Sequence, residues 1–81
     1  MKPEDIIILK GKTLKGKNRI REHGDKWVIF MVGDELPLKF LHGKILIVPE
    51  KDWNNKEAFE NGWKEMRWIH PTNDPDFEVI T

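Results

Sequence analysis

Short apolar runs alternate with charged, glycine-containing segments along this chain, and the pattern predicts a domain built from strands. Residues 6–9 form a β-branched run, and residues 27–32 are apolar at every position, so both segments favour strands. A strand without polar positions is typical of one buried on both faces or curled within a small barrel. Residues 19–22 and 27–32 flank the turn signal His23-Gly24-Asp25-Lys26, and we expect them to form a hairpin.

A second hairpin is predicted around His42-Gly43, with strands at residues 36–41 and 44–48. A two-residue loop there would bring apolar side chains together on one face of the hairpin. The expected cross-strand pairs are Phe40 with Ile45 and Leu38 with Ile47.

After residue 48 the chain becomes more polar, and helical turns are expected as well as strands. Residues 54–61 favour one or two helical turns, with Asp52 as the expected N-cap and Gly62 as the expected stop. Residues 63–70 are predicted to form a strand that Pro71 ends, and residues 77–80 a last short strand. In a strand, Trp63 and Trp68 would point to opposite faces.

Five or six short strands with turn signals at intervals of roughly 8–12 residues favour a small barrel or sandwich. We therefore predict an all-β, SH3-like small barrel with one helical turn or loop insert. Residues 1–81 are expected to form one domain, because a chain of 81 residues can bury only one small core. Residues 1–48 make its basic, two-hairpin part, and residues 49–81 its acidic, tryptophan-bearing part.

The composition removes several kinds of chemistry. The chain has no Cys and no Ser, which excludes disulfides, thiol catalysis and a serine nucleophile. Gly11-Lys12-Thr13 lacks the glycine five residues earlier that a phosphate-binding P-loop requires, since Ile6 stands there, and a strand rather than a helix is expected to follow. His23, His42 and His70 fit turn positions better than a metal site. We expect no enzyme activity, no metal and no cofactor.

The balanced charge of the whole chain conceals an asymmetry. Residues 1–48 carry 10 Lys and Arg against 6 Asp and Glu, whereas residues 49–81 carry 4 against 8. No apolar run approaches the roughly 20 residues that span a bilayer, so a cytoplasmic protein without membrane contact is expected. Between residues 10 and 21 the chain has no acidic residue and six cations: Lys10, Lys12, Lys15, Lys17, Arg19 and Arg21.

Residues 2–20 also resemble a KOW motif, the strand–loop–strand segment of ribosomal proteins of the L24 type and of NusG-type transcription factors. Two features depart from that motif: Gly11 and Lys15 are one residue further apart than usual, and Asn18 replaces the last glycine. The resemblance implies an SH3-like barrel that binds RNA or proteins through its basic loop and neighbouring strand faces. The matching positions are Lys2, Asp5, Ile6, Ile8, Gly11, Lys15-Gly16-Lys17 and Ile20.

Two hypotheses of function follow. The first is a binding module in which the basic loop of residues 10–21 neutralises the phosphates of RNA or DNA, which releases counterions. The second is a protein-interaction adaptor that uses the acidic half, with Trp53, Trp63 or Trp68 as exposed anchors. A small regulator encoded by a virus or a mobile element would fit this second hypothesis.

Overall fold

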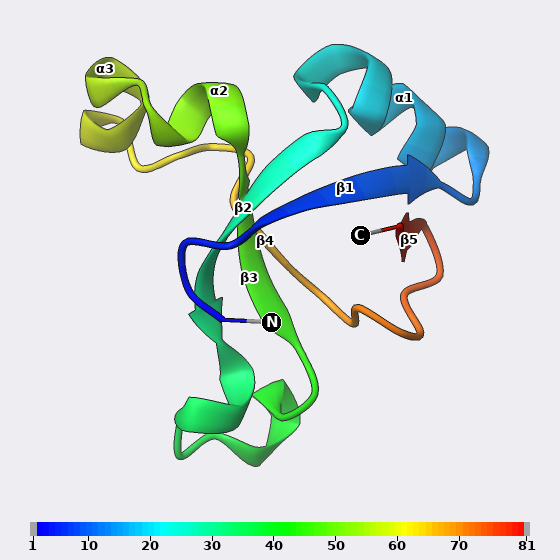
Figure 1. Ribbon diagram of the computed structural model, residues 1–81, viewed down its shortest axis with the longest axis vertical. Coiled ribbons are helices and arrows are strands. Elements are labelled where there is room, and N and C mark those ends of the chain that lie inside the picture. The colour runs from blue at the N-terminus through cyan, green and yellow to red at the C-terminus, as the bar shows by residue number, and fades with distance from the viewer. Residues whose placement is uncertain (1, 81) are drawn as a thin grey trace.

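The computed structural model describes residues 2–80, which form a five-stranded antiparallel sheet curled into a half-barrel (Figure 1). The order of strands across the sheet is β4-β3-β2-β1-β5. This arrangement is consistent with the predicted SH3-like all-β barrel. The strands are β1 (Ile6–Gly11), β2 (Lys26–Val32), β3 (Ile45–Pro49), β4 (Arg67–Ile69) and β5 (Phe77–Val79).

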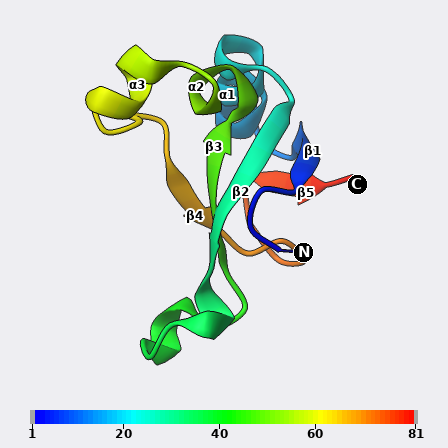
Figure 2. The ribbon, with the colours of Figure 1, turned by 60° about the vertical axis from the view of Figure 1, so that its left-hand side comes forward.

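Short helices connect the strands. They are α1 (Leu14–His23), α2 (Glu50–Trp53) and α3 (Lys56–Glu60), together with the 3₁₀ turns η1 (Gly33–Glu35) and η2 (Lys39–Leu41). The three α-helices gather at one end of the sheet, and the loop of residues 33–44 extends from the opposite end (Figures 1 and 2). Within residues 2–80 no helix is long and apolar enough to cross a membrane.

Alternation of side chains along the strands builds the core on the inner face of the curl. Trp27, as predicted, lies at its centre, and its indole N–H donates to the carbonyl oxygen of Gly24 at 3.0 Å. Val28 and Val48 are buried on the opposite face of the sheet. The start of β2 is therefore buried on both faces, which explains why its first positions after Lys26 are all apolar. The core residues are Ile7, Leu9, Trp27, Ile29, Ile45, Ile47, Ile69 and Phe77.

A side-chain contact spans the opening of the half-barrel. The edge strands β4 and β5 lie at the two ends of the strand order, with four strand pairings between them. The guanidinium carbon of Arg67 on β4 lies 4.7 Å from the ring centroid of Phe77 on β5, a cation–π distance. The curl therefore brings its two edges into contact through side chains.

Both predicted hairpins are wrong. Residues 19–22 lie in α1, and residues 36–41 form a loop with η2 instead of a strand. β2 pairs directly with β3, so that Ile47 lies opposite Ile29, and Phe40 is 70% exposed. The loop of residues 33–44 closes on itself, because the Gly43 N–H donates to Asp34 Oδ1 at 2.6 Å. His42-Gly43 does form the expected turn, in which the Lys44 N–H donates to the Leu41 carbonyl oxygen at 3.0 Å, but this turn follows η2 rather than a strand.

The segment before β4 also differs from expectation. The predicted strand of residues 63–70 shortens to β4, since Trp63 has a φ of 44° and begins a turn. The N-cap of the helical turn is Asn55 rather than Asp52, and Asn55 Oδ1 accepts from the N–H groups of Glu57 and Ala58. Gly62 does end the helix as predicted, with a φ of +81° that glycine adopts at little cost.

Candidate nucleic-acid interface

The basic segment of residues 10–21 is mostly helical, so the predicted basic loop is wrong in conformation. Thr13 caps α1: its backbone is extended, and its Oγ1 accepts from the Gly16 N–H at 3.1 Å. The same hydroxyl donates to Asp76 Oδ1 at 2.8 Å, which ties the start of α1 to the segment before β5. Gly24, with a φ of +87°, ends the helix, and its N–H donates to the Ile20 carbonyl oxygen.

Two glycines allow α1 to lie directly on the backbone of its neighbours. A Cβ atom at Gly16 would lie 2.1 Å from the carbonyl oxygen of Asp76, and one at Gly11 would lie 2.4 Å from the Lys17 nitrogen. Ile20, one turn after Gly16, packs against the core. The inward face of α1 therefore consists of Gly16, Ile20 and His23, and its lysines remain exposed.

The cations of α1 form an exposed surface. Lys15, Lys17 and Arg21 are exposed, and the Arg19 side chain is 39% exposed. Lys10 and Lys12 are exposed as well but lie beside the acidic end of the chain. Lys10 stands opposite Glu78 in the β1–β5 ladder.

A second basic segment adjoins the first in space. An open groove of about 310 Å³ separates α1 from the residues that lead into β4. Lys64 and Arg67 contribute two further cations to this groove, which sequence reasoning did not include because more than 40 residues separate them from α1. The residues that line the groove are Lys15, Arg19, Lys64, Glu65, Met66 and Arg67.

Among residues 2–80, Glu65 is the one carboxylate that lines this groove. Its Oε2 accepts a hydrogen bond from Arg19 Nη1 at 2.9 Å and lies 3.2 Å from His23 Nε2. The His23 contact has the distance of an ion pair but not the geometry of a hydrogen bond. His23 packs edge-on against Trp27, with ring centroids 6.5 Å apart. Glu65 therefore joins α1 to the β4 side of the molecule and partly offsets the positive charge there.

Two of the three tryptophans of the acidic half, Trp53 and Trp63, pack in an aromatic cluster. Trp63 is only 8% exposed, and it stacks on Trp53 with ring centroids 5.3 Å apart and an interplanar angle of 18°. Its indole N–H donates to the Asp52 carbonyl oxygen at 3.0 Å. Phe30 and Phe59 pack edge-on against Trp63. Trp53 and Trp68 are half-buried, and the well-exposed aromatic residue of this cluster is Phe59, at 59%.

The surroundings of the histidines and of the glycine-lysine pair differ in part from expectation. Within residues 2–80 no three His, Asp or Glu side chains gather in a way that could hold a metal ion. His42 Nε2 lies 2.9 Å from the Leu36 carbonyl oxygen, inside its own loop. A helix does follow Gly11-Lys12-Thr13, contrary to expectation, but the first glycine of a P-loop is still replaced by Ile6.

Comparison of the chain with protein-family models, with curated proteins and with solved structures found no match. The resemblance of residues 2–20 to a KOW motif therefore stays a prediction. Within that segment, residues 14–20 lie in a helix, where the motif implies a loop.

Proposed function

We propose that this protein is a non-enzymatic module that binds RNA or DNA by contacting phosphates through the cations of α1 and the adjoining groove. One observation carries the proposal: α1 presents four cations, with Glu22 as the first acidic residue after them. Lys64 and Arg67 continue this surface across the groove. We also expect the protein to act in the cytoplasm, in keeping with its sequence.

A rigid helix suits phosphate binding better than the predicted loop would. Its backbone is already ordered by the Thr13 cap and the glycine contacts, so binding orders only lysine and arginine side chains. Release of counterions from the nucleic acid then supplies the affinity. Because the net charge of the chain is zero, long-range attraction is weak and the local surface must provide most of the binding.

The carboxylates around α1 restrict where phosphates can lie. Asp76 already accepts from the Thr13 hydroxyl at the start of the helix, which places a negative charge at that end. Glu65 similarly engages Arg19 on the groove side. We therefore expect phosphates along the sides of α1, near Lys15, Lys17 and Arg21, and not at its N-terminus.

Fluorescence anisotropy with labelled single-stranded and duplex RNA and DNA, at low and moderate salt, tests the proposal. We expect binding with a log–log salt slope of about −0.7 to −0.9 for each phosphate contacted. Replacing Lys15, Lys17 and Arg21 by Glu is expected to abolish binding, because these side chains are exposed and their loss leaves the core intact.

The matched control replaces the exposed residues Lys2, Lys39 and Lys56 by Glu, which changes the net charge equally but away from α1. We expect it to retain most of the affinity. The proposal fails if the wild-type protein binds none of the four nucleic acids at low salt. It also fails if the α1 variant binds with unchanged salt dependence, or if both variants lose binding equally.

A second candidate, protein interaction through the acidic half, is favoured by the exposure of Phe59. This ring leans on Trp63, with centroids 5.0 Å apart, and lies between Glu57 and Glu60 in sequence. The anchor would then be Phe59 rather than the tryptophans proposed from the sequence, because Trp63 is used for packing. Absence of nucleic-acid binding would favour this candidate, and Phe59→Ala would test it in cross-linking experiments.

A further inference from the structure

The cations of α1 form two rows rather than one patch. Lys15 and Arg19 are one turn apart, and so are Lys17 and Arg21. Residues two positions apart lie about 200° apart around a helix axis, so the two rows occupy opposite flanks of α1. Lys64 extends the first row across the groove, which the Arg67 side chain packed on Phe77 also lines, and Lys10 lies beside Lys17 on the second flank.

The outer side of α1, between the two rows, is uncharged at Leu14 and Asn18 and ends one turn later at the exposed carboxylate of Glu22. Leu14 is 74% exposed, and Asn18, one turn later, is exposed as well. Neither side chain forms part of the core within residues 2–80. An asparagine can make two hydrogen bonds to adenine in the major groove, and an apolar side chain can contact the thymine methyl group.

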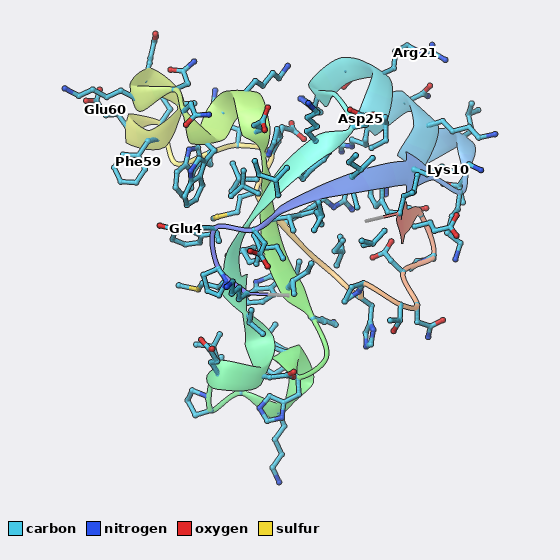
Figure 3. All side chains as sticks on the ribbon, viewed as in Figure 1. Glu4, Lys10, Arg21, Asp25, Phe59 and Glu60 are labelled. Carbon is cyan, nitrogen blue, oxygen red and sulfur yellow. The ribbon has the colours of Figure 1, made fainter. Side chains whose placement is uncertain are left out.

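The position of α1 leaves its outer side accessible. α1 lies at the periphery of the molecule, beside β1, and no other element overlaps it in the view of Figure 1. The side chains of Arg21 and Lys10 project outward from this edge (Figure 3). A helix with its side chains is about 10–12 Å across, which matches the roughly 12 Å width of the major groove of B-form DNA.

We propose that α1 enters the major groove of duplex DNA, with the Leu14–Asn18 ridge toward the base edges and each row of cations against one phosphate backbone. This inference rests on the proposed function and specifies the nucleic acid and its orientation. Duplex RNA does not fit, because its major groove is too deep and narrow for side chains to read. A single strand lacks the second backbone that would meet the opposite row.

The first experiment compares labelled duplex DNA, duplex RNA and single-stranded DNA of one mixed sequence and equal length, at one salt concentration. We expect duplex DNA to bind at least about tenfold more tightly than either of the others. In the same complex, dimethyl sulfate should methylate guanine N7 in the major groove less than in free DNA. Methylation of adenine N3 in the minor groove should be unchanged.

Variants of the two rows and of the ridge complete the test. Lys15→Gln and Lys17→Gln, one from each row, are expected to weaken duplex binding to a similar degree, with Lys39→Gln, in the loop at the opposite end of the sheet, as the unaffected control. Leu14→Ala and Asn18→Ala should keep the fold, because both side chains are exposed. Selection from duplexes with a randomised centre should enrich adenine at one position, and Asn18→Ala should reduce that enrichment about tenfold.

The outcomes separate this inference from the proposed function. If single strands or duplex RNA bind as tightly as duplex DNA, or guanine N7 is not protected, the inference fails while phosphate binding by α1 stands. If adenine is enriched equally with Asn18→Ala, the orientation of the ridge is wrong. If no nucleic acid binds at low salt, both proposals fail.

Discussion

The two helical insertions at the same end of the sheet are attached to it in opposite ways. α1 rests on its neighbours through close backbone approach at Gly11 and Gly16, with Ile20 as its apolar contact. The α2–α3 segment is attached through interlocked rings, in which Trp63 contacts Trp53, Phe59 and Phe30. One insertion uses almost no side chain for packing, and the other uses its largest ones.

This difference determines which side chains are available for binding. Because glycines make the closest contact, Lys15, Lys17 and Arg21 remain exposed, whereas Arg19 forms an ion pair with Glu65. In the α2–α3 segment most of the aromatic residues that could anchor a partner are used for packing within the protein, since Trp63 is buried and Trp53 is half-buried. Charge changes on α1 should therefore affect binding, whereas aromatic changes in residues 50–66 should affect stability.

The largest effect is expected for Trp63→Ala. Removing a buried tryptophan typically costs about 3–5 kcal/mol, and this change also removes the hydrogen bond to Asp52. A domain of this size is expected to have a free energy of unfolding of only about 4–12 kcal/mol. Urea denaturation followed by circular dichroism should show a large fall in the unfolding midpoint.

Phe59→Ala is the matched control, because Phe59 belongs to the same cluster but is 59% exposed. We expect it to cost about 1 kcal/mol, since the exposed part of the ring loses little on truncation. If Trp63→Ala costs no more than Phe59→Ala, the aromatic cluster does not hold the α2–α3 segment in place.

The next largest effect is expected for Gly16→Ala. Alanine favours a helix over glycine by about 1 kcal/mol. Here, however, the new Cβ would lie 2.1 Å from the Asp76 carbonyl oxygen, and that backbone has no flexible side chain that could yield. Overpacking should prevail, with a net loss of about 2 kcal/mol in the free energy of unfolding.

Asn18→Ala provides the comparison on the exposed side of the same helix, where we expect a change within about 0.5 kcal/mol. Both variants can be measured by urea denaturation under identical conditions. A stabilising Gly16→Ala would mean that α1 does not rest on the segment before β5.

Most strands could be predicted from the sequence, because their signals are local. The β-branched run at residues 6–9, the apolar run at residues 27–32 and the turn residues around Pro71 each mark a strand or its end. Burial of Trp27 followed from the same run. These positions are dictated by side-chain alternation and by the need to bury apolar surface.

α1 could not be recognised by its hydrophobic pattern. Its contact face has only Gly16 and Ile20 in the first two turns, so the usual apolar repeat of a packed helix is absent. Thr13 and Gly24, which cap its two ends, were the available signal, but Gly16 matches the loop of the KOW motif and Gly24 fits the turn of a hairpin. Lys64 and Arg67 join the site only through the curl of the sheet, which no local pattern encodes.

The smallest effect on the fold, and an informative one for binding, is expected for Glu65→Gln. The Arg19–Glu65 pair is partly exposed, so its loss should cost about 1 kcal/mol or less. Arg19 would then be available to a phosphate, and the log–log salt slope for nucleic-acid binding should steepen by about 0.7 to 0.9.

Glu60→Gln removes the same charge from α3, far from Arg21 and Lys10 (Figure 3), and should leave the slope unchanged. An equal change in both variants would show that only net charge governs binding, and no change in either would show that Arg19 does not reach the nucleic acid. The comparison thus distinguishes a surface organised around α1 from an attraction spread over the whole molecule.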